Sequence, residues 1–216
     1  MGNRMVAYGG WAFGDSRSDE VTAHTAYADW EHWIAAHDRF AGTPGALHED
    51  EPIRAGTEAA RQLAAARPAL VSTSSTGVIE VDDQVSDLGA YYRRSGTPPA
   101  EPPATFGRGS VVSERTYQLA AAEQVEFLRL SREYVWPWLT AQGARMISYG
   151  HDPLAASDEV ITLFAFRSLP EWHRLSRPSA ERAGVEAAQA WQQRAALIQR
   201  HRGRLLIGDT DFGTLA

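Results

Sequence analysis

The second half of the chain changes between two hydrophobic periods, one typical of strands and one typical of helices. Residues 111–119 alternate with a period of two, which predicts a strand that carries Arg115 and Tyr117 on one face. Residues 121–142 then repeat apolar side chains every three or four positions, which predicts a helix. Gly143 follows in the position where a glycine commonly ends a helix.

The rest of this half continues the same change of period. We expect strands over residues 145–150, 159–166 and 204–208, a short helix over residues 168–174 with Ser168 as its N-cap, and an alanine-rich helix over residues 179–201. The order strand–helix–strand–strand–helix–strand is that of a ferredoxin-like α+β unit. Such a sheet carries helices on one face, so its other face needs a second sheet or another domain. Two units packed face to face form a dimeric α+β barrel.

A proline-rich tract separates two segments. Residues 95–108 contain two Pro-Pro pairs, which neither a helix nor a central strand accommodates, so we expect an extended linker there. The predicted domains are an N-terminal α+β segment over residues 1–94 and a ferredoxin-like domain over residues 109–216.

The N-terminal segment is less regular. We expect strands over residues 6–13, 70–73 and 77–81, and helices over residues 21–40 and 57–67. This order approaches a degenerate second ferredoxin-like unit. Two architectures are therefore open, either two tandem units that form a pseudo-dimer within one chain or a homodimer of chains.

The composition narrows the classes of function. The 216 residues carry a net charge of −6, and such a surface disfavours nucleic acid and anionic membranes as partners. Cysteine and lysine are both absent, which excludes thiolate metal sites, Schiff-base lysines and P-loops. The histidines lack the paired spacing of a metal site, so we expect neither a metal nor another cofactor. No signal-peptide core and no apolar run of ~18 residues occurs, so we expect a cytoplasmic protein.

Short motifs in the second half carry a resemblance to a known family. They are Ser-Glu-Arg-Thr-Tyr-Gln-Leu at residues 113–119, Glu-Phe-Leu at 126–128, Tyr-Val-Trp-Pro-Trp-Leu at 134–139, and Trp191 ahead of Arg-Leu-Leu at 204–206. Together they resemble the NIPSNAP family over residues 109–208. The resemblance implies the dimeric α+β barrel. That superfamily also includes cofactor-free monooxygenases, polyketide cyclases, isomerases and haem proteins, so the fold leaves the reaction open.

Arg115 and Tyr117 are the first candidate catalytic residues. An arginine on a mostly apolar strand face needs an anionic partner. In the functional interpretation, Arg115 anchors a substrate oxygen and Tyr117 donates a hydrogen bond or a proton beside it. In the structural interpretation, Arg115 forms an internal ion pair with Glu126 or Glu133 of the facing helix.

Pro137 lies inside the predicted helix, where it removes a backbone hydrogen bond and produces a kink. A gap between the kinked helix and the sheet is a candidate pocket. Its candidate substrate-binding residues are Glu133, Tyr134, Trp136, Trp138 and Tyr149. Alternatively, the tryptophans belong to a filled core or to a dimer interface.

Two histidines complete the candidates. His151 comes beside Asp152 at the end of a predicted strand, so it is a candidate general base. His173 follows Trp172 and is a candidate substrate-binding residue or haem ligand. Both histidines are also compatible with exposed positions of no catalytic role.

These observations favour a cofactor-free enzyme of bacterial specialised metabolism. The expected reaction is a monooxygenation, isomerisation or cyclisation of an aromatic or polyketide-like small molecule, with Arg115, Tyr117 and His151 as catalytic residues. A non-catalytic ligand-binding or protein-interaction role and a haem-binding role are the alternatives. We expect a small-molecule substrate and a homodimer.

Overall fold

The computed structural model describes residues 4–14, 21–27, 29–31, 33–34, 77–82, 109–154 and 158–208. The chain divides into two compact units, Met5–Ala26 with Val78–Ala216 and Met1–Arg4 with Tyr27–Gly77. The larger unit holds the sheet and the site described below. The predicted linker over residues 95–108 lies outside the described residues, and the predicted domain boundaries remain predictions.

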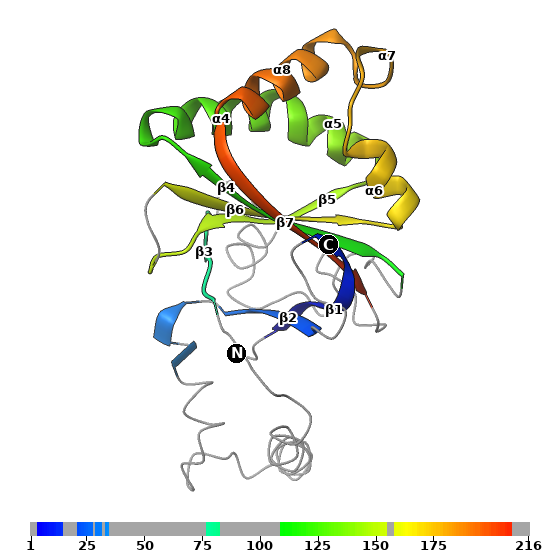
Figure 1. Ribbon diagram of the computed structural model, residues 1–216. Helices are drawn as coiled ribbons and strands as arrows, with labels where there is room; N and C mark the ends of the chain where they lie inside the picture. Colours follow the sequence, from blue (N-terminus) through cyan, green and yellow to red (C-terminus); the bar gives the residue numbers. More distant parts are fainter. Residues whose placement is uncertain are drawn as a thin grey trace, which may run out of the picture. The chain divides into compact units, whose positions relative to one another are not determined.

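The described strands form one seven-stranded sheet in the order β2-β1-β7-β4-β6-β5-β3 (Figure 1). They are β1 Arg4–Gly14, β2 Val21–Ala26, β3 Glu80–Val81, β4 Val111–Leu119, β5 Arg145–His151, β6 Glu159–Phe166 and β7 Ile198–Gly208. The central strands pair antiparallel, β7 with β4, β4 with β6 and β6 with β5. Strand β1 adds to the β7 edge, and β3 adds to the β5 edge.

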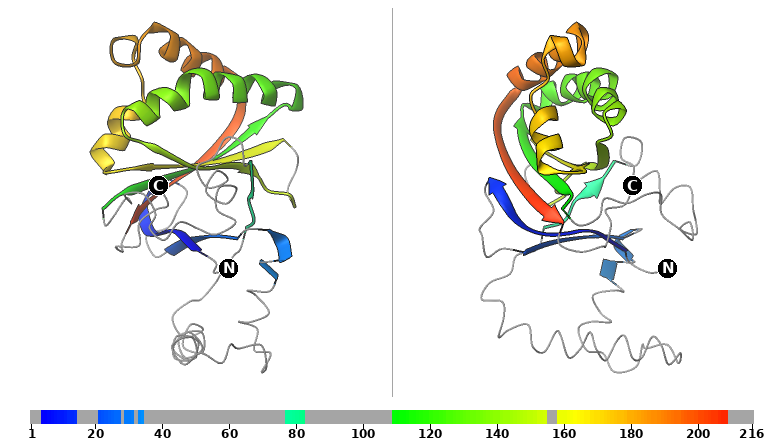
Figure 2. Two further views of the ribbon diagram at one scale, coloured as in Figure 1. Left: turned by 180° about the vertical axis from the view of Figure 1, so that it is seen from behind. Right: turned by 90° about the vertical axis from the view of Figure 1, so that its right-hand side faces the viewer.

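The helices between β4 and β7 all lie on one face of the central strands (Figure 2). They are α4 Gln124–Leu130 and α5 Trp136–Ala141 before β5, and α6 Leu169–Leu175, α7 Ala180–Ala183 and α8 Val185–Ala196 after β6. This order confirms the predicted ferredoxin-like α+β fold. None of the helices in the described part of the chain is long and apolar enough to cross a membrane.

Alternation along the strands separates two hydrophobic clusters. The larger cluster lies between the sheet and the helices and includes Tyr117 and Phe127. The smaller cluster lies on the opposite face and consists of Val112, Ile147, Leu163, Ala165 and Leu206, with Ile79, Val81 and Ile161 packed against it. The five residues of the smaller cluster itself, from Val112 to Leu206, are buried within a single chain. The covering that this sheet face requires is therefore present at these positions without a second copy.

The first predicted helix was wrong over residues 21–26, which form strand β2 instead. Val21, Thr22 and Thr25 are β-branched, and such side chains favour a strand beside a neighbouring strand. Helical backbone is present from Trp30. Residues 35–40 of the predicted helix lie outside the described residues, as do the predicted elements over 57–67 and 70–73.

The last predicted helix was wrong at its C-terminal end. Helix α8 ends at Ala196, and β7 begins at Ile198 rather than at residue 204. Residues 198–203 pair with β4, with Ile198 opposite Leu119, so sheet hydrogen bonds override the helical tendency of this stretch. Gly184, with a φ of 82°, also separates α7 from α8.

Two predicted helix boundaries are confirmed. The backbone N–H of Glu171 donates to Ser168 Oγ at 3.3 Å, so Ser168 caps α6. The Glu171 carboxylate accepts from the Arg167 N–H at 2.6 Å, which satisfies a further donor at this end. Residues 121–141 form the first helical region, which includes α4 and α5. Gly143 follows this region with a φ of 94°, a conformation that favours glycine.

The kink predicted at Pro137 stays a prediction, and a π-helical turn over Ser131–Val135 lies just before it, between α4 and α5. The N–H of Trp136 donates to the Ser131 carbonyl, five residues earlier. Pro137 has no N–H and lies in the first turn of α5. A π-turn adds one residue to the helical path, which changes the side chains that face the sheet. Trp136 is buried after this turn, with its ring centroid 5.4 Å from that of Tyr149.

A polar cluster joins β2 to the central sheet on the face away from the helices. His24 Nε2 lies 3.3 Å from Glu114 Oε2, and Arg204 Nη2 donates to Glu114 Oε1 at 2.8 Å. Burial alone would raise the pKa of Glu114, but its contacts with His24 and Arg204 outweigh burial and hold that pKa below its usual value. The carboxylate therefore stays ionised and connects three strands.

Candidate functional site

A narrow cavity lies between the central sheet and its helices. Its walls come from β4 and β6 on one side and from α5, α6 and α8 on the other. Strand β4 presents Ser113, Arg115 and Tyr117 to it, β6 presents Thr162, and α8 presents Arg194. The period of β4 places Arg115 and Tyr117 on the same face, where the sequence predicts them.

Aromatic rings form much of the remaining wall. They are Trp136, Phe164, Phe166, Trp172 and Trp191. An apolar wall with a few convergent polar groups is typical of small-molecule sites. Hydrogen bonds and charges are also stronger beside such a wall than in water.

Arg194 is buried on the inner face of α8, with 6% of its surface exposed. Its guanidinium carbon lies 5.0 Å from the centroid of the Trp191 ring and 5.1 Å from that of the Phe127 ring. Its Nη1 donates to Ser131 Oγ at 3.3 Å, whereas its Nε has no hydrogen-bond partner among the described residues. Burial lowers the pKa of Arg194, and the nearby Tyr117 acts in the opposite direction.

Tyr117 is 4% exposed, and its ring centroid lies 5.2 Å from that of Phe127. The guanidinium carbon of Arg194 lies 5.7 Å from the centroid of the Tyr117 ring. Burial alone would raise the pKa of this phenol. The positive charges of Arg194 and Arg115 outweigh burial and hold the pKa of Tyr117 below its usual value. Tyr117 therefore loses its proton more readily than an ordinary tyrosine.

Arg115 is half-buried and faces the same cavity. Its Nε donates to Ser113 Oγ at 3.3 Å, and Thr162 lies opposite it on β6. Among the described residues, no carboxylate forms an ion pair with Arg115 or Arg194. Two guanidinium groups thus share one cavity without a carboxylate from that part of the protein, and the acidic group that acts on both is the Tyr117 phenol.

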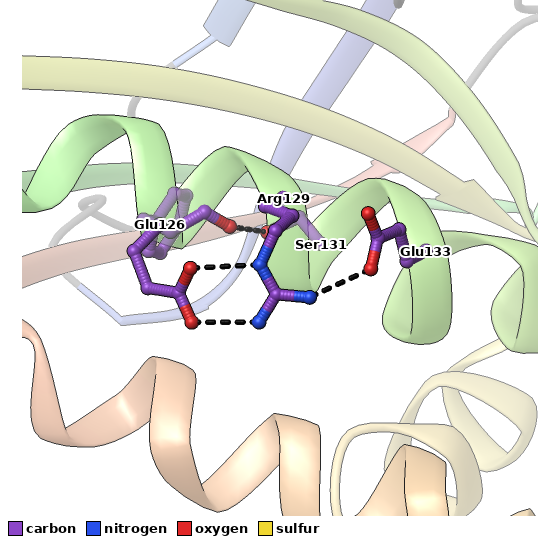
Figure 3. Close-up of polar contacts among 5 residues, drawn as sticks. Glu126, Arg129, Ser131 and Glu133 are labelled. Carbon is purple, nitrogen blue, oxygen red and sulfur yellow. Dashed lines mark hydrogen bonds and ion pairs between the residues drawn. The ribbon is translucent and has the colours of Figure 1, made fainter.

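The structural interpretation of Arg115, an ion pair with Glu126 or Glu133, is wrong. Figure 3 shows that both carboxylates instead contact Arg129 on the outer face of the same helical region. Arg129 Nη2 lies 2.7 Å from Glu126 Oε1, and Arg129 Nη1 lies 2.7 Å from Glu133 Oε2. These contacts follow the three- and four-residue spacing of a helix surface.

Six predicted site residues do not line the cavity, three of them charged or imidazole side chains and three of them aromatic. Glu133 is exposed in the ion pair with Arg129. His151 is exposed at the end of β5, with Nε2 3.7 Å from Glu80 Oε2. His173 is exposed on the outer side of the short helix α6. Each of these polar side chains lies on the solvent side of its element, so the structure does not bring them to Arg115.

The other predicted aromatic residues lie behind the cavity wall. Trp138 packs edge-on against Trp191 with 6.4 Å between ring centroids, and Tyr134 packs at the margin of the same cluster. Tyr149 is buried beside Trp136. Burial and the charge of Asp82 raise the pKa of Tyr149 to about 12. Of the predicted aromatic set, only Trp136 lines the cavity itself.

Arg194 is the main residue that sequence reasoning missed. A signal was present, because Arg194 follows Ala190 by four residues on the buried face of an alanine-rich helix, and both are buried. An arginine on the apolar stripe of a helix needs a partner just as one on an apolar strand face does. The same reasoning that selected Arg115 would have selected Arg194.

No protein-family model matches the chain, and no curated protein matches it significantly. Solved structures do match. A NIPSNAP family protein from Agrobacterium tumefaciens is 22% identical over 54% of this chain and 100% of its own, with a TM-score of 0.43. NIPSNAP proteins are thus among the matching solved structures.

Two other solved structures cover nearly the whole chain. A presumed monooxygenase from Lactobacillus acidophilus is 8% identical over 97% of this chain and 78% of its own, with a TM-score of 0.57. A presumed monooxygenase from Fusobacterium nucleatum is 10% identical over 98% of this chain and 78% of its own, with a TM-score of 0.55. At such identities the likeness is one of fold.

Proposed function

We propose that the protein is a cofactor-free enzyme that removes a proton from an aromatic or polyketide-like small molecule bound in this cavity. The observation that supports the proposal most is the meeting of Arg115, Arg194 and Tyr117 among aromatic rings without a described carboxylate. Such a site stabilises negative charge on an oxygen atom. Formation of an enolate or phenolate is the step that monooxygenation, isomerisation and cyclisation of such substrates share.

Each residue has a role in this step. Arg115 and Arg194 donate hydrogen bonds to the oxygen on which negative charge develops. Tyr117, in its ionised form, accepts the proton from the substrate carbon or hydroxyl. The aromatic wall excludes water, so the arginines act at low dielectric and the anion is not reprotonated by solvent.

The three expected reactions differ after this step. In a monooxygenation, the enolate carbon adds O₂ to form a hydroperoxide, which loses water and leaves a ketone. The substrate then loses two hydrogen atoms and gains one oxygen atom, and the second oxygen atom leaves as water. In an isomerisation the proton returns to another carbon, and in a cyclisation the enolate carbon attacks a carbonyl group of the same molecule. The fold shared with presumed monooxygenases supports the first outcome at the level of fold alone.

The two alternative functions, non-catalytic binding and haem binding, would use the cavity in different ways. A non-catalytic binding protein would hold the same ligand without moving a proton. Among the described residues no histidine lines the cavity, so this part of the chain offers no imidazole for a haem iron.

Deuterium exchange tests the proposal without knowledge of the natural substrate. The probe is 2-tetralone, a ketone whose CH₂ group between the ring and the carbonyl is activated, incubated in D₂O and followed by NMR. We expect the wild-type protein to accelerate exchange, and Tyr117→Phe to reduce that acceleration about 100-fold. Arg115→Met should reduce it as well, whereas Tyr134→Phe, which changes a tyrosine outside the cavity, should not. Exchange at the buffer rate, or exchange that survives Tyr117→Phe, would reject the proposal.

A further inference from the structure

We propose that the ligand of this cavity is an aromatic oxyanion, a carboxylate or phenolate on a planar ring, and that Arg194 and Arg115 hold its charged oxygen from opposite walls. This inference rests on the proposed function, because it concerns the same cavity. It goes further by assigning the charge of the ligand before any reaction. It also assigns a binding role to Arg194, a residue that the sequence analysis did not select.

The charges around the cavity favour an anionic ligand. Arg194 is buried, Arg115 is half-buried, and neither forms an ion pair with a carboxylate in the described part of the chain. Two like charges in one apolar cavity destabilise each other, and burial adds a desolvation cost. A bound monoanion reduces both effects, because it adds at low dielectric a negative charge beyond that of the Tyr117 phenol.

The hydrogen-bond donors of the two arginines also favour an anion. Arg194 Nε is buried, has no partner among the described residues, and belongs to a side chain that lines the cavity. Arg194 Nη1 and Arg115 Nε make contacts of 3.3 Å with serine hydroxyls, at the long end of the hydrogen-bond range. Charged oxygen acceptors form shorter and stronger bonds with guanidinium groups than hydroxyls do. The site therefore has unused donor capacity of the kind that an oxyanion satisfies.

The aromatic wall of the cavity favours a ligand with a planar ring. Trp136, Trp172 and Trp191 line the cavity beside the arginines. Flat apolar walls around a charged end favour a planar ring that carries one anionic group over a small inorganic anion. The chemistry that fits is a benzoate-like or phenolate-like molecule.

Tryptophan fluorescence of the full-length protein tests this assignment, because three tryptophans line the cavity. The probes are benzoate and 4-nitrophenolate, with the neutral analogues benzamide and 4-nitroanisole. We expect each anion to bind the wild-type protein at least about tenfold more tightly than its neutral analogue. The two pairs distinguish a carboxylate ligand from a phenolate ligand.

Variants assign the effect to the two arginines. Arg194→Met and Arg115→Met should each reduce the anion preference to about twofold or less, while Arg200→Met, which changes an exposed arginine of β7, should leave it unchanged. Circular dichroism establishes that each variant is folded, and Arg194→Gln provides a second neutral variant if the methionine variant does not fold.

Equal binding of anions and neutral analogues, absence of binding by all four probes, or an anion preference that survives both substitutions would overturn the inference. The outcome is separable from that of the proposed function. If the protein exchanges the protons of 2-tetralone but shows no anion preference, the oxyanion inference is rejected and the proposed enzymatic function stands. If the protein prefers anions but catalyses no exchange, the proposed enzymatic function is rejected and the oxyanion-binding site stands.

Discussion

Tyr117 and Tyr149 are both buried on the helix-facing side of one sheet, yet their surroundings act on them in opposite directions. Burial and Asp82 raise the pKa of Tyr149 to about 12. At Tyr117 burial acts in the same sense, but Arg194 and Arg115 outweigh it and lower the pKa. The cavity thus selects one of two buried phenols for ionisation.

We expect ultraviolet absorbance to detect this difference. On titration with base, folded wild-type protein should form a phenolate below the usual tyrosine pKa of 10.0, and Tyr117→Phe should lack that component. Tyr149→Phe should instead lose a component near pH 12. Identical titration curves below pH 10.0 for wild type and Tyr117→Phe would contradict the assignment.

The contributions of Tyr117 and Tyr149 to the free energy of unfolding should also change with pH in opposite directions. Below 10.0, the unfolded state holds the proton of Tyr117 more tightly than the folded state, so this residue adds stability as pH rises from its folded pKa toward 10.0. Tyr149 behaves in the opposite way, because its contribution is present below the unfolded pKa and is lost as pH approaches 12. Denaturant unfolding of the two phenylalanine variants at several pH values measures both trends.

Arg194 carries the second expectation at the residue scale. A buried guanidinium group with an unpaired Nε costs stability, whereas methionine keeps the apolar contacts with Phe127 and Trp191. We therefore expect Arg194→Met to raise the free energy of unfolding by about 1 kcal/mol, as is common when a functional residue is replaced by a better-packed one. Denaturant unfolding without ligand measures it. A clear loss of stability would indicate that the protein itself balances this charge.

At the scale of elements, local pattern predicted most of the second half. The alternation of side chains predicted β4, and the period of three to four residues predicted the first helical region. Ser168 and Gly143 predicted two helix boundaries that the structure confirms. Local pattern failed where pairing with a distant strand decides the conformation. Residues 198–203 join β7 because β4 is available beside them, and 21–26 form β2 in the same sheet.

The pairing of β3 with β5 gives an expectation at this scale. Gly150 lies opposite Val81, and a side chain on Gly150 would meet the backbone carbonyl of Glu80. We expect Gly150→Ala to separate β3 from β5 and to lower the free energy of unfolding by about 2 kcal/mol. Gly203→Ala is the control, because a side chain there makes only ordinary contacts. Hydrogen exchange at Asp82, whose N–H donates to Tyr149 O at 2.8 Å, should increase in the first variant alone.

At the scale of the whole molecule, the candidate site shows the limit of sequence reasoning. Arg115 and Tyr117 share a strand, so alternation alone places them together. Arg194 and Ser131 are 63 residues apart, and their contact exists only because α8 packs against the first helical region. Glu133, His151 and His173 have the right chemistry, but their elements turn them to solvent.

The homodimer stays a prediction. A second copy is not needed to bury the centre of the sheet face opposite the helices. The centre of the sheet face opposite the helices is buried within one chain. We therefore expect the chain to stay folded by circular dichroism when it is diluted below the concentration at which light scattering detects a dimer. Loss of the folded signal at that dilution would show that a second copy completes the fold.

The central claim is that the cavity between the sheet and the helices binds an anion through Arg194. Nitrogen–proton NMR spectra of the arginine Nε groups test it most directly, because Arg194→Met identifies the Arg194 resonance by its loss. We expect that resonance to shift downfield when benzoate is added and to stay in place when benzamide is added, since a charged acceptor forms a strong hydrogen bond with this donor, which has no partner among the described residues. An Arg194 resonance that responds to neither compound, or equally to both, would contradict the account.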